Sequence, residues 1–242
     1  MSALTADTVF LLDVDNTLLD NDRVIADMRQ HLQTQFGAAA DSYWTAFEML
    51  RDEVGYADYL GALQRFRAGF EHDAGSAHRL LSMSSFLIDY PFAERLYPKV
   101  LAVVARLGTL GTTVILSDGD VVFQPRKVQR VGLWDAVDGR VLIYIHKERM
   151  LDAVQRCYPA RRYVMVDDKL RILRAMKDIW RDRLLTVFPR QGHYAHDPTQ
   201  LARYGAADVS VERIGDLLDF DFDFGVDFDT APPPVNVQQE TD

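Results

Sequence analysis

The sequence predicts an α/β protein in which a parallel β-sheet carries an inserted helical unit. Five short apolar runs are rich enough in β-branched and aliphatic residues to form strands buried on both faces. Most of them are separated by segments with helical spacing, and strand alternating with helix is typical of an open α/β sheet. The predicted strands cover residues 9–14, 113–116, 141–145, 163–166 and 184–188.

A helix is expected immediately before the second predicted strand. Apolar residues recur at every third or fourth position from Leu96 to Leu107. Pro98 suits the first turn, where its missing N–H costs nothing. Gly108 is expected just past the last turn, where glycine commonly ends a helix.

Residues 20–94 interrupt this alternation with an all-helical pattern. Apolar side chains recur at helical spacing in three successive stretches, and a fourth helix is expected around residues 77–86. Four helices can bury a small core of their own, so we expect a separate lobe that forms a lid. The three apolar faces consist of Ile25, Met28, Leu32 and Phe36; of Phe47, Leu50 and Val54; and of Tyr59, Leu63, Phe66 and Phe70.

These patterns divide the chain into three parts. Residues 1–19 and 95–219 are predicted to form a Rossmann-like parallel-sheet core domain, and residues 20–94 an inserted α-helical cap. Residues 220–242 form an acidic tail of Asp-Phe pairs followed by prolines. Such a composition cannot pack alone, so we expect the tail to be flexible unless its aromatic side chains dock on the body.

Composition excludes several classes of function. Of the 36 acidic residues, eight lie from Asp216 onward with no lysine or arginine among them, which leaves 28 against 27 basic residues. A nearly neutral body has no basic excess for nucleic acid. Neither a signal peptide nor a membrane span is expected, because the first apolar stretch ends at Asp13. The single Cys157 cannot form an intramolecular disulfide, so the expected location is the cytoplasm.

Polar residues follow four of the predicted strands. In an open α/β sheet these strand ends meet in one crevice, which is where ligands bind. Crowded carboxylates raise one another's pKa and oppose folding, so a cation is expected among them. An oxygen-only ligand set favours Mg²⁺. The residues concerned are Asp13, Asp15 and Asn16; Ser117, Asp118 and Gly119; Lys147; and Asp167 and Asp168.

Mg²⁺, a lysine and a hydroxyl in one crevice suit a phosphoryl group. The metal and Lys147 would neutralise its oxygens, while Ser117 and the amides of the turns donate hydrogen bonds. Asp13 is then the expected nucleophile. Asp15, two residues on, would protonate the leaving oxygen and later activate water against an aspartyl-phosphate. The predicted substrate-binding set is Asn16, Ser117, Asp118, Gly119 and Lys147.

These motifs resemble those of the haloacid dehalogenase (HAD) superfamily of phosphatases. The resemblance covers residues 8 to about 215, and the helical insert lies where that family has its C1-type cap. It implies that Asp167 binds Mg²⁺ together with Asp13 and the Asp15 carbonyl. The matching segments are Asp13-Val14-Asp15-Asn16-Thr17, Val114-Ile115-Leu116-Ser117-Asp118-Gly119, Lys147 and Val166-Asp167-Asp168.

The sequence departs from the family pattern in three places. Lys147 lies in His146-Lys147-Glu148-Arg149 and lacks the prolines that often come directly after the lysine of this family. Arg171 occupies the position of a second acid that many relatives carry after the fourth motif, so Asp168 is the acid available for that role. The predicted metal set is therefore Asp13, Asp15, Asp167 and Asp168. The tail after Asp219 has no counterpart in the family pattern.

Within the superfamily, the residues favour hydrolysis of a phosphate monoester. Dehalogenases lack an acid at the position of Asp15, because halide leaves without a proton. Phosphonatases and phosphoglucomutase-like members use a lysine of the lid, and residues 20–94 contain none. The expected substrate is a small phosphorylated metabolite, which a lid of this size would enclose. Neither a particular ester nor an oligomeric state is predicted.

Two other classes of function were weighed. A non-catalytic protein with the same scaffold would recognise a partner through the cap or the acidic tail. An aspartyl-phosphate receiver shares the residue types, but its paired acids and its lysine come in a different order along the chain. The filled set of catalytic positions favours the enzyme.

Several residues are assigned structural rather than functional roles. In the alternative interpretation, Asp167 and Asp168 are an N-cap and its neighbour at a helix start, with Lys169 and Arg171 on the solvated surface. Cys157 is expected to be buried as an apolar side chain. His193 and His196 are assigned to a loop at the rim of the site rather than to a metal. Aromatic residues at helical spacing in the cap are expected in its core rather than facing a substrate; they are Tyr43, Trp44, Tyr56 and Tyr59.

Overall fold

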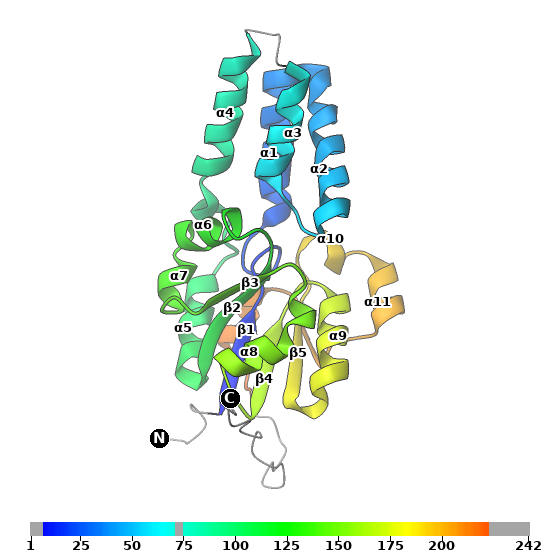
Figure 1. Cartoon of the computed structure of the whole chain (residues 1–242). Coiled ribbons are helices and arrows are strands. Elements are labelled where there is room, and N and C mark those ends of the chain that lie inside the picture. The colour runs from blue at the N-terminus through cyan, green and yellow to red at the C-terminus, as the bar shows by residue number, and fades with distance from the viewer. Residues whose placement is uncertain (1–6, 71–74, 223–242) are drawn as a thin grey trace, which may run out of the picture.

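The computed structural model describes residues 7–70 and 75–222 and contains a six-stranded sheet in the order β3-β2-β1-β4-β5-β6 (Figure 1). Every neighbouring pair of strands is parallel, which confirms the predicted α/β, Rossmann-like fold. The three-residue strand β6 was too short to be recognised from sequence. The strands are β1 (Thr8–Leu12), β2 (Thr112–Asp118), β3 (Val141–Tyr144), β4 (Arg162–Val166), β5 (Leu184–Pro189) and β6 (Val209–Val211).

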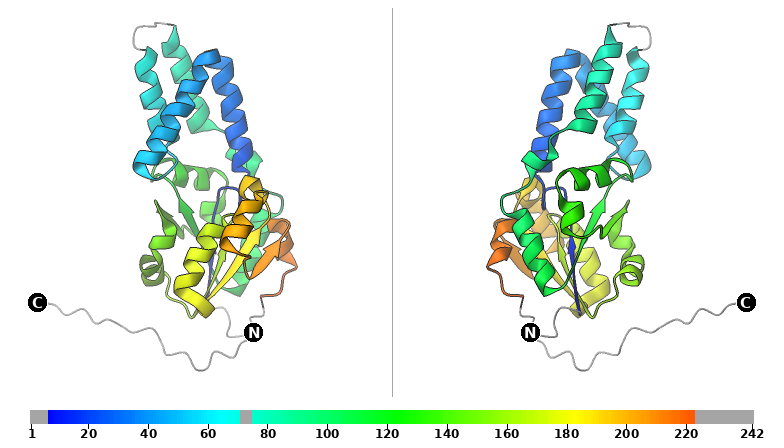
Figure 2. Two further views of the ribbon diagram at one scale, coloured as in Figure 1. Left: turned by 90° about the vertical axis from the view of Figure 1, so that its right-hand side faces the viewer. Right: turned by 90° about the vertical axis from the view of Figure 1, so that its left-hand side faces the viewer.

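Helices cover both faces of the sheet (Figure 2). Alternation along β1 directs Phe10 and Leu12 to one face and Val9 and Leu11 to the other. The first pair packs with α5, α6 and α7, and the second with α8 and α9. Only β3 lacks the double burial expected of it, because it lies at an edge of the sheet. The core helices are α5 (Val100–Leu110), α6 (Phe123–Arg130), α7 (Leu133–Ala136), α8 (Leu151–Cys157), α9 (Leu170–Trp180), α10 (Gly192–Ala195) and α11 (Pro198–Tyr204).

Helix α5 ends later than the sequence predicted. Gly108 lies within the helix, and Gly111 is the residue that caps it, donating its N–H to the carbonyl of Leu107. A side chain at Gly111 would place its Cβ 2.4 Å from the carbonyl oxygen of Thr8. Close approach of β1 therefore determines where α5 stops, and this contact between distant segments was not visible in the local pattern.

Four helices stand above the carboxyl ends of the strands and form the cap (Figure 1). The two connections to the core run side by side, since the N–H of Asp20 donates to the carbonyl of Arg95 and that of Tyr97 to Leu18. The apolar side chains of the cap belong to the same continuous cluster as one face of the sheet, so the cap has no separate core. Its helices are α1 (Asn21–Phe36), α2 (Ala40–Val54), α3 (Tyr59–Arg67) and α4 (Ser76–Asp89).

The first residues of the predicted tail are attached to the body. Phe222 is buried and meets Phe10 edge to face, with ring centroids 5.2 Å apart. The carbonyl of Phe220 accepts a hydrogen bond from Arg106. Residues 223–242 of the predicted tail lie outside the described residues. Cys157 is exposed at the end of α8, so the prediction that it is buried was wrong.

Within residues 7–70 and 75–222, no helix combines the length and the apolar character that crossing a membrane requires.

The two glycines of this segment should respond oppositely to alanine. Gly111→Ala should lower the free energy of unfolding by about 1–3 kcal/mol, because its Cβ would collide with the Thr8 carbonyl. Gly108→Ala should raise it by up to about 1 kcal/mol, since Gly108 is helical and has open space around its Cβ position. Urea unfolding measures both, and equal effects would contradict the assigned end of α5.

Candidate active site

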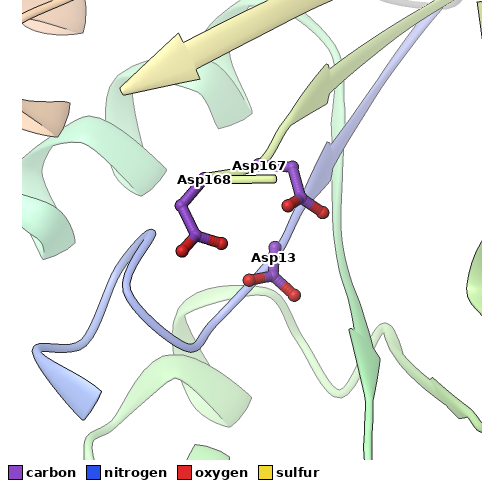
Figure 3. Close-up of side chains that lie close together, drawn as sticks. All are labelled: Asp13, Asp167 and Asp168. Atoms are coloured by element: carbon purple, nitrogen blue, oxygen red, sulfur yellow. The ribbon is translucent and has the colours of Figure 1, made fainter. Parts of the chain in front are cut away.

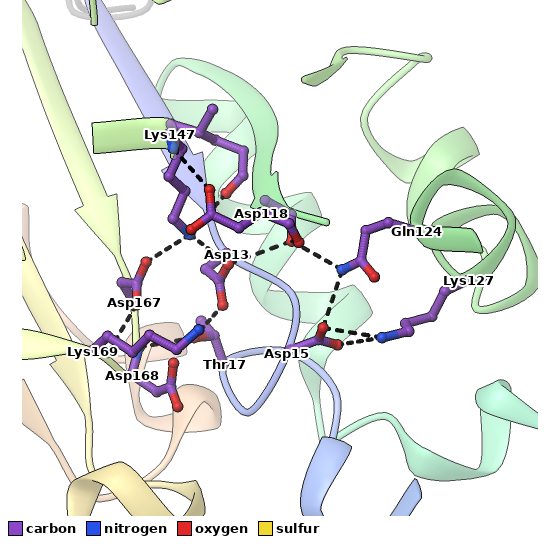
Figure 4. A network of polar contacts seen from close by, with 12 residues as sticks. Asp13, Asp15, Thr17, Asp118, Gln124, Lys127, Lys147, Asp167, Asp168 and Lys169 are labelled. Carbon is purple, nitrogen blue, oxygen red and sulfur yellow. Dashed lines mark hydrogen bonds and ion pairs between the residues drawn. The ribbon is translucent and has the colours of Figure 1, made fainter. Parts of the chain in front are cut away.

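The polar residues predicted from the strand ends meet at the edge of the sheet that faces the cap. Asp13 follows β1, Ser117 and Asp118 end β2, and Asp167 and Asp168 follow β4. The side chains of Asp13, Asp167 and Asp168 converge in Figure 3, and Figure 4 shows Asp118 close to them. Parallel strands bring these segments together although more than a hundred positions separate Asp13 from the others along the chain.

Lys147 joins two of the carboxylates. Its side chain is fully buried, and its Nζ lies 2.5 Å from Asp13 Oδ1 and 2.7 Å from Asp167 Oδ2. It also donates to the carbonyl of Leu116. Burial opposes the charged form, but the carboxylates of Asp13 and Asp167 outweigh it and raise the pKa of Lys147 above its ordinary value. Lys147 is therefore a permanent cation beside Asp13.

Two hydroxyls and a carboxylate complete the surroundings of Asp13. Thr17 Oγ1 donates to Asp13 Oδ2 at 3.3 Å and accepts from the N–H of Asp168. Ser117 Oγ lies 3.5 Å from Asp13 Oδ1. Asp118 turns away to accept the N–H of Lys147 and so holds the start of that segment. Burial raises the pKa of Asp118, although Lys147 opposes the shift.

Asp13, Asp167 and Asp168 form a buried acidic cluster (Figure 3). One ligand atom from each lies within 4.8 Å of the others. Among the described residues, neither carboxylate oxygen of the fully buried Asp168 has a hydrogen-bond partner. Burial raises the pKa of Asp168 well above 3.8 and that of Asp167 to about 6, against the opposing effects of Lys169 and Lys147 respectively. Such unpaired carboxylate oxygens fit a bound divalent cation.

Asp15 lies beside this cluster but not in it. Its side chain is 26% exposed, and its carboxylate oxygens lie 2.7 and 3.0 Å from Lys127 Nζ. Gln124 donates to the same carboxylate at 3.3 Å (Figure 4). The Asp15 side chain is therefore held by α6 and not by the acidic cluster, whereas the metal ligand that the family resemblance implies is its backbone carbonyl.

Asn16 joins the loop after β1 to the cap. Its φ of 61° lies in the left-handed region, which asparagine tolerates. Its side-chain oxygen Oδ1 accepts hydrogen bonds from the backbone N–H groups of Asn21 and Asp22, and its side-chain nitrogen Nδ2 donates to Asp22 Oδ1. Gly192 lies so close that a Cβ there would meet Asn16 at 2.6 Å. The Asn16 side chain thus binds the first residues of α1, and its predicted role in substrate binding stays a prediction.

A cavity of about 620 Å³ lies between the cap and the sheet edge. Asp15, Asn16, Asp118 and Gly119 line its core side. Its cap side includes Arg29, Trp44, Arg51 and Tyr56. The prediction that the cap aromatics are core residues holds for the buried Tyr43. It is wrong for Trp44 and Tyr56, which are half-buried at the cavity wall, and Tyr59 is buried but also lines the cavity.

The sequence did not identify three residues of this region. Lys127 and Gln124 lie three positions apart on α6, a spacing that places them on one helix face, but nothing local shows that this face meets Asp15. Lys169 was expected on the surface; instead it is half-buried and lines the cavity. Burial opposes its charge, yet Asp168, Asp13 and Asp167 raise the pKa of Lys169 above its ordinary value.

His193 lines the cavity, as predicted for a residue of the rim, although it lies in the short helix α10 and not in a loop. The His193 Nδ1 atom is 2.6 Å from Asp22 Oδ1, and the backbone N–H of His193 donates to Asp22 Oδ2. Asp22 belongs to α1, so this contact ties the loop after β5 to the cap. Arg171 lies at the surface, as predicted, and pairs with Glu148 at 2.7 Å.

Comparisons with known proteins agree with this architecture. A crystal structure of a haloacid dehalogenase-like hydrolase from Burkholderia xenovorans LB400 is 66% identical, covers 89% of this chain and 99% of its own, and has a TM-score of 0.82. The L-2-haloacid dehalogenase from Xanthobacter autotrophicus is 17% identical over 86% of this chain and 96% of its own, with a TM-score of 0.56. A magnesium-bound HAD hydrolase from Bacillus subtilis is 15% identical over 89% and 98%, with a TM-score of 0.55.

The two distant relatives share the fold alone, and no curated protein sequence matches the chain. The family model described as haloacid dehalogenase-like hydrolase matches residues 8–179, which is well over half of the sequence. Together with the close relative from Burkholderia xenovorans, this match leads to one conclusion. The chain belongs to the haloacid dehalogenase-like hydrolase family.

Proposed function

We propose that the protein is a Mg²⁺-dependent phosphatase that hydrolyses a small phosphorylated metabolite through an aspartyl-phosphate. The observation that carries the proposal is the contrast between two neighbouring carboxylates. The Asp13 side chain is 4% exposed and paired with Lys147, whereas the Asp15 side chain is 26% exposed, lines the cavity and is paired with Lys127. Two acids in different surroundings suit two roles, one as nucleophile and one in proton transfer.

In the first step a carboxylate oxygen of Asp13 attacks phosphorus. The bond from phosphorus to the ester oxygen breaks, and its electron pair stays on that oxygen, which takes a proton from Asp15. The alcohol leaves. The Lys147 ammonium and the Ser117 hydroxyl, both beside Asp13, neutralise charge on the transferring phosphoryl group.

In the second step water hydrolyses the aspartyl-phosphate. The Asp15 carboxylate accepts a proton from water as its oxygen attacks phosphorus, and the bond from phosphorus to Asp13 breaks. Inorganic phosphate is released, Asp13 returns to a carboxylate and Asp15 is protonated again. The cap limits the access of bulk water during the first step.

The acidic cluster supports the choice of a metal-dependent reaction. Asp13, Asp167 and Asp168 would hold Mg²⁺, and the unpaired oxygens of Asp168 are the strongest sign of a missing cation. When bound, Mg²⁺ supplies positive charge against the phosphoryl oxygens and offsets the repulsion between the carboxylates.

Asp15 also helps to distinguish the proposed reaction from the removal of a halide, the reaction for which the distant L-2-haloacid dehalogenase is named. Halide leaves without a proton, so the first step of that reaction has no use for an acid facing the cavity. A cavity of about 620 Å³ is of a size typical for small-molecule ligands, which favours a metabolite over a protein substrate.

Replacing the nucleophile should abolish turnover. Asp13→Asn removes the attacking carboxylate but keeps the shape of the side chain, so hydrolysis of para-nitrophenyl phosphate should fall by at least about 10³-fold. The control Asp178→Asn changes an exposed acid on α9 and should match the parent. Phosphate release by Asp13→Asn at a rate near that of the parent would refute the proposed nucleophile.

The substrate class is tested by giving the purified parent two panels of compounds. Phosphate monoesters should be hydrolysed with added Mg²⁺ and not with excess EDTA, as followed by phosphate release. A panel of haloacids should release no halide, which an ion-selective electrode measures. Halide release without phosphate release would replace the proposed phosphatase by a dehalogenase.

Asp168→Asn should have opposite effects on stability with and without metal. Because the native pKa of Asp168 is raised, the ionised carboxylate destabilises the metal-free fold; this penalty is absent below about pH 4 and complete above the native pKa. In EDTA the free energy of unfolding of the variant should therefore exceed that of the parent by about 1–3 kcal/mol at neutral pH, and by less near pH 4.

Added Mg²⁺ should reverse that order, since saturation at about 1,000 times the Kd stabilises the parent by about 4.1 kcal/mol while the variant binds weakly. Thermal unfolding of both proteins, with Asp178→Asn as the control, measures each arm. A parent whose melting temperature is insensitive to Mg²⁺ would contradict the metal site.

A further inference from the structure

Lys127 is a buried cation that the proposed reaction does not yet use. It lies on α6, is 1% exposed, and places its Nζ 2.7 Å from one oxygen of Asp15 and 3.0 Å from the other (Figure 4). Its remaining described polar contact is with Asn21 Oδ1, at 3.3 Å. Asn21 is the first residue of α1, so the ammonium sits between the catalytic loop and the base of the cap.

The surroundings of Lys127 hold it in place. The rings of Phe92 and Phe123 lie 5.9 and 5.7 Å from its Nζ, and both side chains are buried. In such apolar surroundings the ammonium has little access to water and depends on Asp15 and Asn21 for compensation. The Asp15 carboxylate is consequently pinned to one position.

Gln124, one helical turn before Lys127, extends this network toward the nucleophile. Its amide donates to Ser117 Oγ at 3.0 Å and to Asp15 Oδ2 at 3.3 Å. Ser117 in turn lies next to Asp13. One face of α6 therefore sets the position of Asp15 relative to the group that attacks phosphorus.

Stability alone does not account for a buried lysine here. A buried ion pair can often be replaced by apolar side chains without loss of stability, because desolvation offsets the attraction between the charges. Position is what the pair supplies, since both oxygens of Asp15 face one fixed ammonium. Catalytic groups need such support from neighbouring side chains.

We propose that Lys127 is a positioning residue that acts through Asp15, holding its carboxyl group where it meets the leaving oxygen. This inference rests on the proposed phosphatase function. When the proton of Asp15 passes to the leaving oxygen, the new carboxylate forms beside the ammonium, so the contact strengthens as the reaction proceeds.

Leaving groups distinguish this role from a structural one. Phenyl phosphate needs a proton on its departing oxygen, whereas dinitrophenyl phosphate expels a stable anion. In Lys127→Met the first turnover of phenyl phosphate should slow by about 10²-fold or more, the usual contribution of a positioned acid, while that of dinitrophenyl phosphate should change less than about twofold. First turnovers are compared by rapid quench because Asp15 also serves the second step.

Two comparisons make the result independent of folding. The ratio of the two rates within one preparation does not depend on the fraction of folded protein. Lys177→Met is the matched control. Lys177 lies away from the site, with its Nζ 2.8 Å from Asp208 Oδ2, so the ratio of the two rates in this variant should equal that of the parent.

In an Asp15→Asn background, Lys127→Met should add no further loss in the rate with phenyl phosphate, because Lys127 acts through Asp15.

The outcomes separate the two proposals. If Lys127→Met leaves the ratio of the two first-turnover rates unchanged, whether both esters are slowed equally or neither is slowed, the positioning role is overturned while the phosphatase function stands. A further loss with phenyl phosphate in the Asp15→Asn background also overturns it. A parent that cleaves neither ester with Mg²⁺ overturns the phosphatase function, and the inference with it.

Discussion

The structure depends on compensating several carboxylates that the fold gathers at one edge of the sheet. Lys147 lies between Asp13 and Asp167, and Lys127 faces Asp15. Each of these lysines is almost completely buried, so its charge is fully effective on its neighbours. Of the buried carboxylates that the structure describes, Asp168 is the one that lacks a hydrogen-bond partner for both oxygens. The imbalance that a divalent cation would remove is therefore concentrated on one side chain.

The same edge also anchors the cap. Asn16, in the loop that carries the first two aspartates, caps the base of α1, and Asp22 of α1 contacts His193 beyond β5. Lys127 reaches Asn21 at the same place. The loop after β1 and the cap thus share hydrogen bonds at one junction. The cap side of the cavity is therefore joined by these hydrogen bonds to the loop that carries Asp13 and Asp15.

Much of the fold was predictable because buried parallel strands produce continuous apolar runs. Five of the six strands were recognised in this way, whereas β6 has three residues and offers no pattern. The local pattern predicts a helix end at Gly108. The true end at Gly111 depends on the approach of Thr8, which lies far away along the chain and leaves no local signal. Cys157 and Lys169 were misplaced for a related reason. Their exposure depends on which neighbours cover them, and residue type indicates that only on average.

Hydrophobic period and motif spacing are local properties, so residue order was enough to predict the strands and helices and the acids, hydroxyl and lysine that follow the strands. Contacts between distant segments of the fold place the Asp15 carboxylate against Lys127 and Gln124, leave Asp168 unpaired and put Trp44 at a cavity wall. These are properties of pairs and surfaces. They arise when a helix face and a strand end come within a few ångströms, and their separation in space is set by the packing of the whole chain.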